Sequence, residues 1–187
     1  MKRASFLIIG VAFLCLQTAL VGAESAQEKE AARNATREQV RQALEDATTH
    51  GSLNVVFRQN EAQPYNFVGS MESGLAHAES LEIVISVSNS ATIHFRVYPH
   101  YKGGYINVDK AKDGPGLMRQ LLRFSDQNFL YWGIDDSHDV FCGYTFTLES
   151  GFPKEAVRVV LNSIHNTDGF VADLGPFIDG PAPAAEP

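Results

Sequence analysis

Apolar residues recur every three or four positions in three parts of the chain, which is the spacing of one face of a helix. These parts are residues 36–51, 113–125 and 151–169. Thr36 and Gln39 have the spacing of a capping box, and Pro115 falls in the first turn of the second part, where proline is tolerated. The pattern predicts three helices.

Five other stretches alternate apolar and polar residues, the pattern of a strand with one buried face. They are residues 53–57, 81–87, 93–97, 129–134 and 140–148. The second and third flank Asn89 and Ser90, which predicts a hairpin. Between the first and second, a polar stretch with Pro64 and Gly69 predicts a loop, with a helical turn near residues 71–78.

The predicted order of elements is α-β-β-β-α-β-β-α. Because hairpin connections dominate, we expect an α+β domain with a largely antiparallel sheet and the helices on one face. We expect this single domain to span residues 36–179. A polar, charged segment at 24–35 predicts a flexible lead-in or a frayed helical extension, and the Pro- and Ala-rich residues 180–187 predict a disordered tail.

The amino terminus has the three parts of a secretory signal peptide. Lys2 and Arg3 are basic, residues 6–16 are an apolar run too short to span a bilayer, and Val21-Gly22-Ala23 places small residues at a cleavage site. We expect residues 1–23 to be removed and the mature chain to be periplasmic or secreted, without membrane insertion. An uncleaved membrane anchor is the alternative.

Charge and cysteine content narrow the function classes. Loss of residues 1–23 removes Lys2 and Arg3 and takes the formal net charge from −7 to −9. An acidic chain without a basic stripe is a poor match for nucleic acid or anionic lipid. The mature chain then keeps only Cys142, whose place in an alternating apolar run predicts a buried side chain rather than a reactive thiol.

Five residues are the predicted binding residues, and most of them lie in one aromatic loop. Residues 98–105 place several aromatic rings around a Gly-Gly pair, and loops on a rigid scaffold often carry function. On the strand 129–134, neighbouring rings must face opposite sides of the sheet, which adds one exposed aromatic residue. The predicted set is Tyr98, His100, Tyr101, Tyr105 and Trp132. The alternative is that the tyrosines only cover a sheet edge.

The segment Asp135-Asp136-Ser137-His138-Asp139 has the residue types that hold a hard cation. The glycine and the downstream glutamate of an EF-hand calcium loop are missing, however. We favour a hairpin turn whose Asp and Ser side chains bond their own backbone. The histidines show no paired metal-ligand spacing, so we predict no metal site.

The C-terminal part of the chain resembles a known family. Residues 128–134, the acidic turn 135–139, the strand 140–148 and Gly151-Phe152-Pro153-Lys154-Glu155 before the last helix look like the C-terminal half of a YbjN-type domain. That family is described as bacterial sensory-transduction regulators and shares the fold and element order of the type III secretion chaperones. The resemblance implies a chaperone-like fold and a binding role, with no catalytic residue or cofactor to carry over. Those chaperones are cytoplasmic, whereas this chain has a predicted signal peptide, so we expect an envelope or secreted partner.

These features predict a non-enzymatic protein-binding or regulatory module of the bacterial cell envelope, such as a chaperone-like adaptor. No Gly-x-Ser-x-Gly motif and no nucleophile in an activating context occurs in the sequence. One alternative is a metal-dependent protein or enzyme that uses the turn 135–139. The other is a structural subunit of an envelope assembly.

Self-association is a separate expectation. Chaperones of the resembled fold pair through their second helix, and helix 114–125 has more apolar width than one buried face requires. Its apolar residues are Leu117, Met118, Leu121, Leu122 and Phe124. We therefore expect a homodimer through this helix. The alternative is that the helix lies deep in its own fold, with Phe124 turned toward the C-terminal hairpin.

Overall fold

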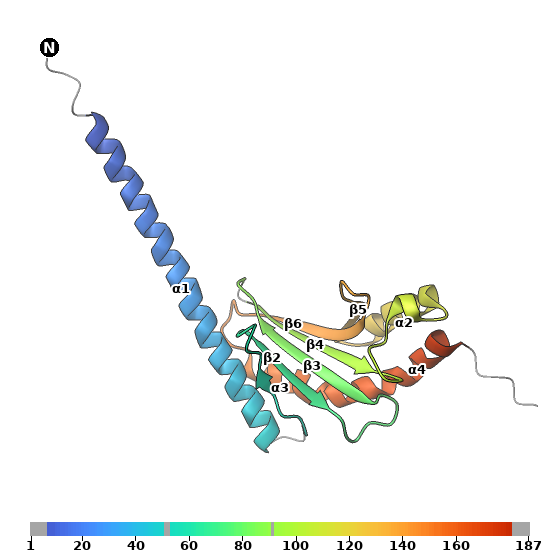
Figure 1. Cartoon of the computed structure of the whole chain (residues 1–187). Coiled ribbons are helices and arrows are strands. Elements are labelled where there is room, and N and C mark those ends of the chain that lie inside the picture. Colours follow the sequence, from blue (N-terminus) through green and yellow to red (C-terminus); the bar gives the residue numbers. More distant parts are fainter. Residues whose placement is uncertain (1–6, 51–52, 91, 181–187) are drawn as a thin grey trace, which may run out of the picture.

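Helices and strands alternate along the chain and assemble into one sheet with helices packed against it (Figure 1). The computed structural model describes residues 7–50, 53–90 and 92–180, and within the first helix it describes side chains from residue 26 to 49. The α-helices are α1 (Leu7–His50), α2 (Gly114–Gln127), α3 (Lys154–Ser163) and α4 (Thr167–Asp179). The strands are β1 (Arg58–Gln59), β2 (Asn66–Met71), β3 (Ser80–Val87), β4 (Thr92–His100), β5 (Tyr131–Ile134) and β6 (Val140–Thr147). Two short 3-10 helices are η1 (Val108–Lys110) and η2 (Ile164–Asn166).

The strands form one antiparallel sheet of six in the order β1-β2-β3-β4-β6-β5. The central pair β3 and β4 is joined by the predicted hairpin and stays in register from Val87↔Ile93 at the turn to Ser80↔His100 at the far end. The α+β class and the antiparallel sheet are therefore confirmed.

Alternation along β3 and β4 divides the sheet into two faces. Every second residue is buried and the residues between are partly exposed. On the buried face, which we call the core face, lie Leu81, Ile83, Ile85, Val87, Ile93, Phe95 and Val97. On the opposite face, which we call the open face, lie Glu82, Val84, Ser86, His94, Arg96, Tyr98 and His100. His94 therefore faces away from Phe95.

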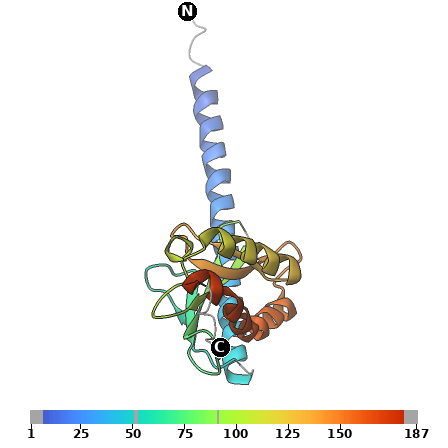
Figure 2. The same cartoon turned by 90° about the vertical axis from the view of Figure 1, so that its right-hand side faces the viewer.

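Every helix contributes buried side chains to the same core as the core face. These side chains are Val40 and Leu44 of α1, Leu117, Leu121 and Phe124 of α2, Val157, Val160 and Leu161 of α3, and Val171 and Leu174 of α4. Figure 1 shows α3 and α4 running beneath the sheet, and Figure 2, seen from the α4 side, shows α1 rising behind them. The open face is left to loops and solvent.

The first helix begins far earlier than the sequence pattern indicated. The predicted start at Thr36 is wrong, because the hydroxyl of Thr36 donates to the carbonyl of Ala32 one turn earlier, at 3.0 Å, instead of capping a helix. Residues 24–35, predicted as a flexible lead-in, lie within α1. They are rich in Ala and Glu, which favour helix. Residues 1–6 of the predicted signal peptide and 181–187 of the predicted tail lie outside the described residues.

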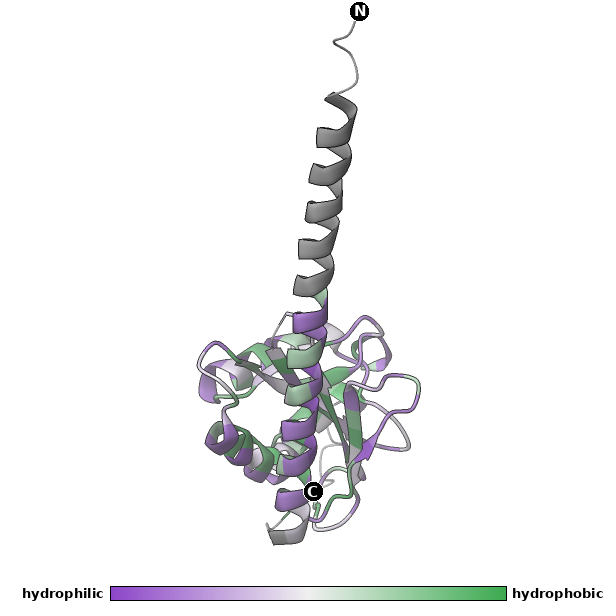
Figure 3. Cartoon of the chain, turned by 90° about the vertical axis from the view of Figure 1, so that its left-hand side faces the viewer, coloured by the Kyte–Doolittle hydropathy of each residue, from purple (hydrophilic) through white to green (hydrophobic). Residues whose placement is uncertain are grey.

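Arg33 fastens α1 to the end of the sheet. Its Nε and Nη2 donate to the carbonyl of Val87 at 3.0 and 2.8 Å, and its guanidinium lies 3.4 Å from the centre of the Tyr65 ring. The Tyr65 hydroxyl bonds Asn34 in turn, at 3.0 Å. In the part of α1 that lies against the domain, hydrophilic and hydrophobic residues alternate along the helix (Figure 3). No helix of the described residues is both long and apolar enough to cross a membrane.

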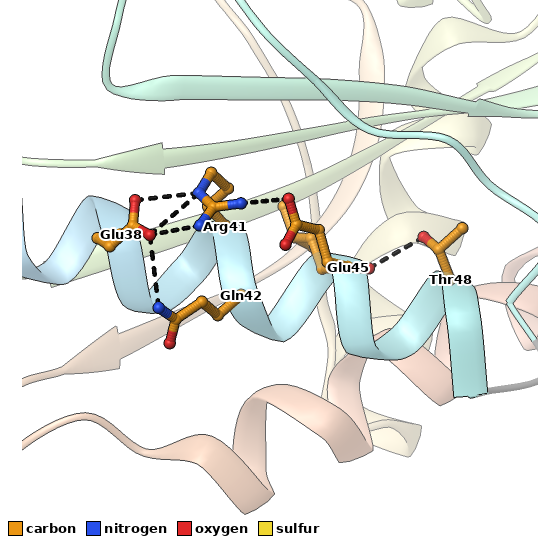
Figure 4. A network of polar contacts seen from close by, with 6 residues as sticks. Glu38, Arg41, Gln42, Glu45 and Thr48 are labelled. Carbon is orange, nitrogen blue, oxygen red and sulfur yellow. Dashed lines mark hydrogen bonds and ion pairs between the residues drawn. The ribbon is translucent and has the colours of Figure 1, made fainter.

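The outer surface of α1 carries a network of charged and polar side chains (Figure 4). Arg41 pairs with Glu38 and Glu45, which lie three residues before it and four residues after it. Such exposed pairs stabilise a helix by only about 0.2–0.5 kcal/mol each. The network therefore supports the helix locally and contributes little to the position of α1 on the domain.

The first strands differ from the prediction. Leu53 and Val55 are buried as the alternation implied, but residues 53–57 form no ladder and pairing begins only at Arg58. β2 lies where we predicted a loop and a helical turn. The prediction missed this strand because its core-face residues are Phe67, Gly69 and Met71, and the glycine interrupts the apolar alternation. A side chain at Gly69 would lie 2.6 Å from Val55, so the glycine admits the preceding segment.

The predicted third helix is two helices joined by η2, so its predicted end at Asp168 is wrong. Asp168 lies in the first turn of α4 and is buried. Its carboxylate accepts hydrogen bonds from the backbone N–H groups of Ala76, His77 and Ala78 at 2.7, 3.0 and 2.7 Å. It therefore ties the β2–β3 loop to α4 across about ninety residues of sequence.

The apolar residues of α2 are mostly used inside the fold. Leu117, Leu121 and Phe124 are buried, and Met118 packs against the core. The Phe124 ring lies 5.3 Å from that of Trp132 and 4.8 Å from that of Phe170. Only Leu122 is largely exposed, so the apolar surplus of this helix is smaller than its sequence indicated, and the homodimer through residues 114–125 stays a prediction.

Cys142 lies on β6 with its side chain fully buried, as predicted. Burial raises the pKa of its thiol to about 12, and the nearest hydrogen-bonding group is the Thr167 hydroxyl at 3.4 Å. Because the thiolate is the reactive form of cysteine, this buried, protonated thiol is unreactive in the folded protein.

Replacement of Asp168 tests the contact between the β2–β3 loop and α4. Burial alone would raise the pKa of this carboxyl, but the three backbone donors hold it below its ordinary value. We expect Asp168→Ala to lower the free energy of unfolding at pH 7 by about 2–4 kcal/mol, because one buried and two partly buried backbone donors lose a charged acceptor. Asp173→Asn, an exposed position on the same helix, should change it little.

The same contact has a defined pH dependence. A depressed folded-state pKa contributes stability above the unfolded value of about 4, and this contribution is lost as pH falls through the folded pKa. In chemical unfolding, the difference between wild type and Asp168→Ala should therefore shrink below about pH 4. A difference that is constant from pH 7 to pH 3 would contradict the assignment.

Thiol labelling tests the burial of Cys142. In a Cys15→Ser chain, we expect an aromatic disulfide reagent to modify Cys142 at least 100-fold faster in denaturant than under native conditions, because reaction requires the core to open. Rapid native labelling would contradict the buried, protonated thiol.

Candidate functional site

The open face carries a compact group of aromatic rings around one arginine. Phe141 of β6 lies at its centre, with the Arg96 guanidinium 4.4 Å from the centre of its ring. The rings of Tyr98 and Tyr131 lie 5.7 and 5.9 Å from that of Phe141. Although Phe141 faces away from the core, only 5% of it is exposed, because these three neighbours cover it. We call Arg96, Tyr98, Tyr131 and Phe141 the aromatic patch.

Strand pairing and one glycine position the patch. Arg96 is opposite Gly143 on β6, and Gly143 is opposite Tyr131 on β5. A side chain at Gly143 would lie 3.1 Å from the Tyr131 hydroxyl and 2.6 Å from the Phe95 carbonyl. The missing side chain therefore leaves room for Tyr131 to lie across β6 toward Arg96.

A second cluster adjoins the patch at the end of β4. The Tyr105 hydroxyl donates to Glu82 at 2.9 Å, and the Tyr105 ring lies 4.3 Å from that of His100 and 5.8 Å from that of Tyr98. The Nε2 of His100 is 3.9 Å from Glu82 and has no hydrogen-bond partner in the described part of the chain. Tyr105 is 42% exposed and Tyr131 is 38% exposed, so their rings flank the more buried centre of the face.

The loop that carries Tyr105 is folded back by a tight turn. Tyr101 N–H donates to the carbonyl of Gly104 at 2.8 Å, and Lys102 and Gly103 take positive φ values of 52° and 86°. His100 and Tyr105 then form a β-bridge. The following residue, Ile106, is buried and its carbonyl accepts from Val140 N–H at 2.8 Å, which fixes the loop between β4 and β6.

Of the five predicted binding residues, the structure brings Tyr98, His100 and Tyr105 together on the open face. Tyr101 is directed elsewhere, with its hydroxyl 2.8 Å from Asp179 at the end of α4. Trp132 is corrected from a binding residue to a core residue: it is 5% exposed and packs on Phe124.

The sequence reasoning missed Arg96 and Phe141. Arg96 stands two residues before Tyr98 on a strand of period two, so it had to share a face with that tyrosine. The same alternation that predicted opposite sides for Tyr131 and Trp132 correctly separates them. Alternation alone does not say which of the two rings faces the core. The ring on the open face is that of Tyr131, whereas the predicted set had named Trp132.

The electrostatics of the face favour neutral phenols and a charged arginine. Burial, with the Glu82 hydrogen bond, raises the pKa of Tyr105 to about 12. Burial also raises the pKa of Tyr98, while Arg96 opposes that shift. Burial lowers the pKa of Arg96, but the Tyr98 hydroxyl and nearby acidic groups outweigh it and the net shift is upward. Both phenols are therefore protonated donors at neutral pH, and Arg96 is a cation.

The acidic turn between β5 and β6 is occupied by its own hydrogen bonds. Asp135 accepts from the backbone N–H groups of Ser137 and Asp139 at 2.9 and 3.0 Å. Asp139 accepts from the Asn107 side chain at 2.8 Å, and His138 lies 2.6 Å from Asp109. Among the described side chains no group of three or more His, Cys, Asp or Glu residues could hold a metal ion. The geometry is that of a self-bonded hairpin turn.

A shallow hollow extends the open face toward β1. Its volume is about 730 Å³, and its lining includes Val56, Arg58, Val68, Ser70 and Glu82. Glu82 also belongs to the Tyr105 cluster, so the hollow and the aromatic patch are parts of one continuous surface. A separate groove of about 390 Å³ lies beside α1, where Arg33 is already bonded to the sheet.

Comparison of the chain with protein-family models, with curated proteins and with solved structures finds no match. The resemblance of residues 128–168 to a YbjN-type domain therefore stays a prediction from sequence.

Proposed function

We propose that this protein is an exported, non-enzymatic protein-binding module of the bacterial cell envelope, a chaperone-like adaptor that holds its partner against the open face of the sheet. The predicted signal peptide supports the location, and the resemblance to YbjN-type domains supports the binding role. The proposal depends most on one observation, the aromatic patch around Arg96.

The composition of this surface suits a protein interface. Tyrosine and arginine are enriched among the residues that dominate binding energy, and such residues cluster at well-packed centres. Phe141 and Arg96 form a packed centre here, and Tyr105 and Tyr131 present exposed rings beside it. Because these side chains already hold one another in place, binding would cost little side-chain entropy.

The polar groups of the face favour recognition over catalysis. The Glu82 carboxylate is engaged by Tyr105, and the phenols of Tyr98 and Tyr105 are both protonated at neutral pH. Cys142 is enclosed on the other side of the sheet. Saturable turnover by the purified protein that is lost when one polar residue is changed would contradict the proposal.

A structural subunit of an envelope assembly would use the same surface. The two roles differ in occupancy, because a subunit co-purifies in fixed stoichiometry and an adaptor does not. A homodimer through residues 114–125 would leave the open face available, and light scattering over a wide concentration range measures it directly.

Photo-crosslinking in cells tests the surface. A benzoyl-phenylalanine in place of Tyr131 or Tyr105 should give discrete protein adducts, whereas the same group at Leu122, which is 66% exposed on α2, should not. Tyr131→Ala should weaken binding of the crosslinked partner about tenfold or more, because truncation of a central aromatic residue costs at least about 1.4 kcal/mol. Leu122→Ala is the matched control. Adducts from Leu122 alone would place the partner elsewhere.

Processing of the amino terminus tests the proposed location. In bacteria we expect the mature protein to begin at Glu24, as read by intact mass, and to fractionate with the periplasm or medium. Ala23→Asp should leave the precursor uncleaved, because the site requires a small residue. A wild-type chain that keeps residues 1–23 in the membrane fraction would show that the segment is an anchor.

A further inference from the structure

Arg96 is a charged side chain that the fold positions but does not pair. It lies on the central strand β4 and is only partly exposed. The ion pairs found among the described residues do not include it, so no carboxylate of this part of the chain comes within 4 Å of its nitrogens. Partial burial of a charge is unfavourable unless a counter-charge or hydrogen bonds compensate it.

The guanidinium nevertheless has two contacts that position it. Its flat side lies over Phe141, and Nη1 donates to the Tyr98 hydroxyl at 3.3 Å. An arginine has five N–H donors, and this is the only one of them bonded to a described protein acceptor. The remaining donors have no acceptor among the described residues and lie on the face that also carries Tyr131, whose ring is 5.9 Å from that of Phe141.

The acidic groups nearest to Arg96 have other partners. Glu82 accepts from Tyr105 at 2.9 Å. Asp135 accepts two backbone N–H groups within its turn. The open face therefore has a cation with no carboxylate of the described residues within 4 Å, although the chain as a whole carries a net charge of −7.

From this imbalance we infer that Arg96 receives an Asp or Glu side chain of the partner protein, held in a two-pronged hydrogen bond between the rings of Tyr98 and Tyr131. The inference rests on the proposed function and names the chemistry that the open face recognises. A planar guanidinium matches a carboxylate in two parallel hydrogen bonds, which gives orientation as well as affinity.

The surrounding charge makes this residue decisive for specificity. If Arg96 were missing, an acidic segment of the partner would face only the carboxylates of Glu82 and Asp135 on a domain of net negative charge. Like charges brought together in this way reject a ligand. Arg96 therefore determines whether acidic segments are accepted at all, while the rings beside it accept apolar neighbours of the carboxylate.

Selection from random dodecapeptides displayed on phage, with the immobilised full chain as bait, tests the inference. We expect the enriched peptides to share an Asp or Glu next to an aromatic or aliphatic residue. The strongest peptide is then synthesised with its acidic residue intact, neutralised to the amide, or replaced by arginine. Fluorescence anisotropy measures binding of each to the wild-type and variant chains.

Arg96→Gln should weaken the acidic peptide at least tenfold and the amide peptide much less, and Arg96→Lys should retain part of the affinity because it keeps the charge but not the planar fork. Arg96→Glu should bind the arginine peptide better than the acidic one. Arg123→Gln, at an exposed position of α2 away from the open face, is the control and should change little. Circular dichroism melts establish that each variant is folded.

Two results separate this inference from the proposed function. Peptides whose binding is lost in Tyr131→Ala but unchanged in Arg96→Gln and Arg96→Lys would overturn the role of Arg96 and keep the open face as the binding surface. Enriched peptides insensitive to all of these variants would overturn both. Failure to enrich any acidic peptide would also overturn the inference.

Discussion

The pairing of β3 with β4 is the constraint on which the rest of the structure depends. Side chains of a strand alternate between faces, so a central ladder with apolar residues at every second position can bury only one face. Leu81, Ile83, Phe95 and Val97 form that face. All four helices pack on it, and the other face is left uncovered. The separation of a core from a recognition surface is therefore a consequence of period-two patterning in two strands.

Long-range polar contacts then fix the positions of elements that the alternation of buried residues does not fix by itself. Asp168 holds the β2–β3 loop through three backbone donors, and Arg33 holds α1 through the carbonyl of Val87. Each contact satisfies backbone groups outside the regular ladders, where an unpaired buried group costs about 1–3 kcal/mol. These contacts determine where the helices meet the ends of the sheet.

The aromatic patch depends on the same geometry at closer range. Phe141 on β6 is shielded on the open face because Arg96 and Tyr98 of β4 and Tyr131 of β5 lie beside it in a fixed register. Gly143 provides the space for Tyr131. The patch is thus ordered before any partner binds, and its one unpaired charge is held on the rigid centre of the sheet. Affinity and selectivity both benefit from such preorganisation.

The sequence by itself determined the class of the fold, the central hairpin and the buried state of Cys142, because each follows from local periodicity. It grouped Tyr98 with His100 in one aromatic segment, but predicted a loop where β4 continues through both residues. It failed where local signals are absent or misleading. Gly69 hid the alternation of β2, and Thr36 looked like a cap although helix-forming residues precede it. Only the tertiary structure decided which of Tyr131 and Trp132 faces the core, since alternation separates two neighbours without naming the buried one. Packing against Phe124 and Phe170 made that choice, and the register of β4, β6 and β5 placed Arg96 at the centre of the open face.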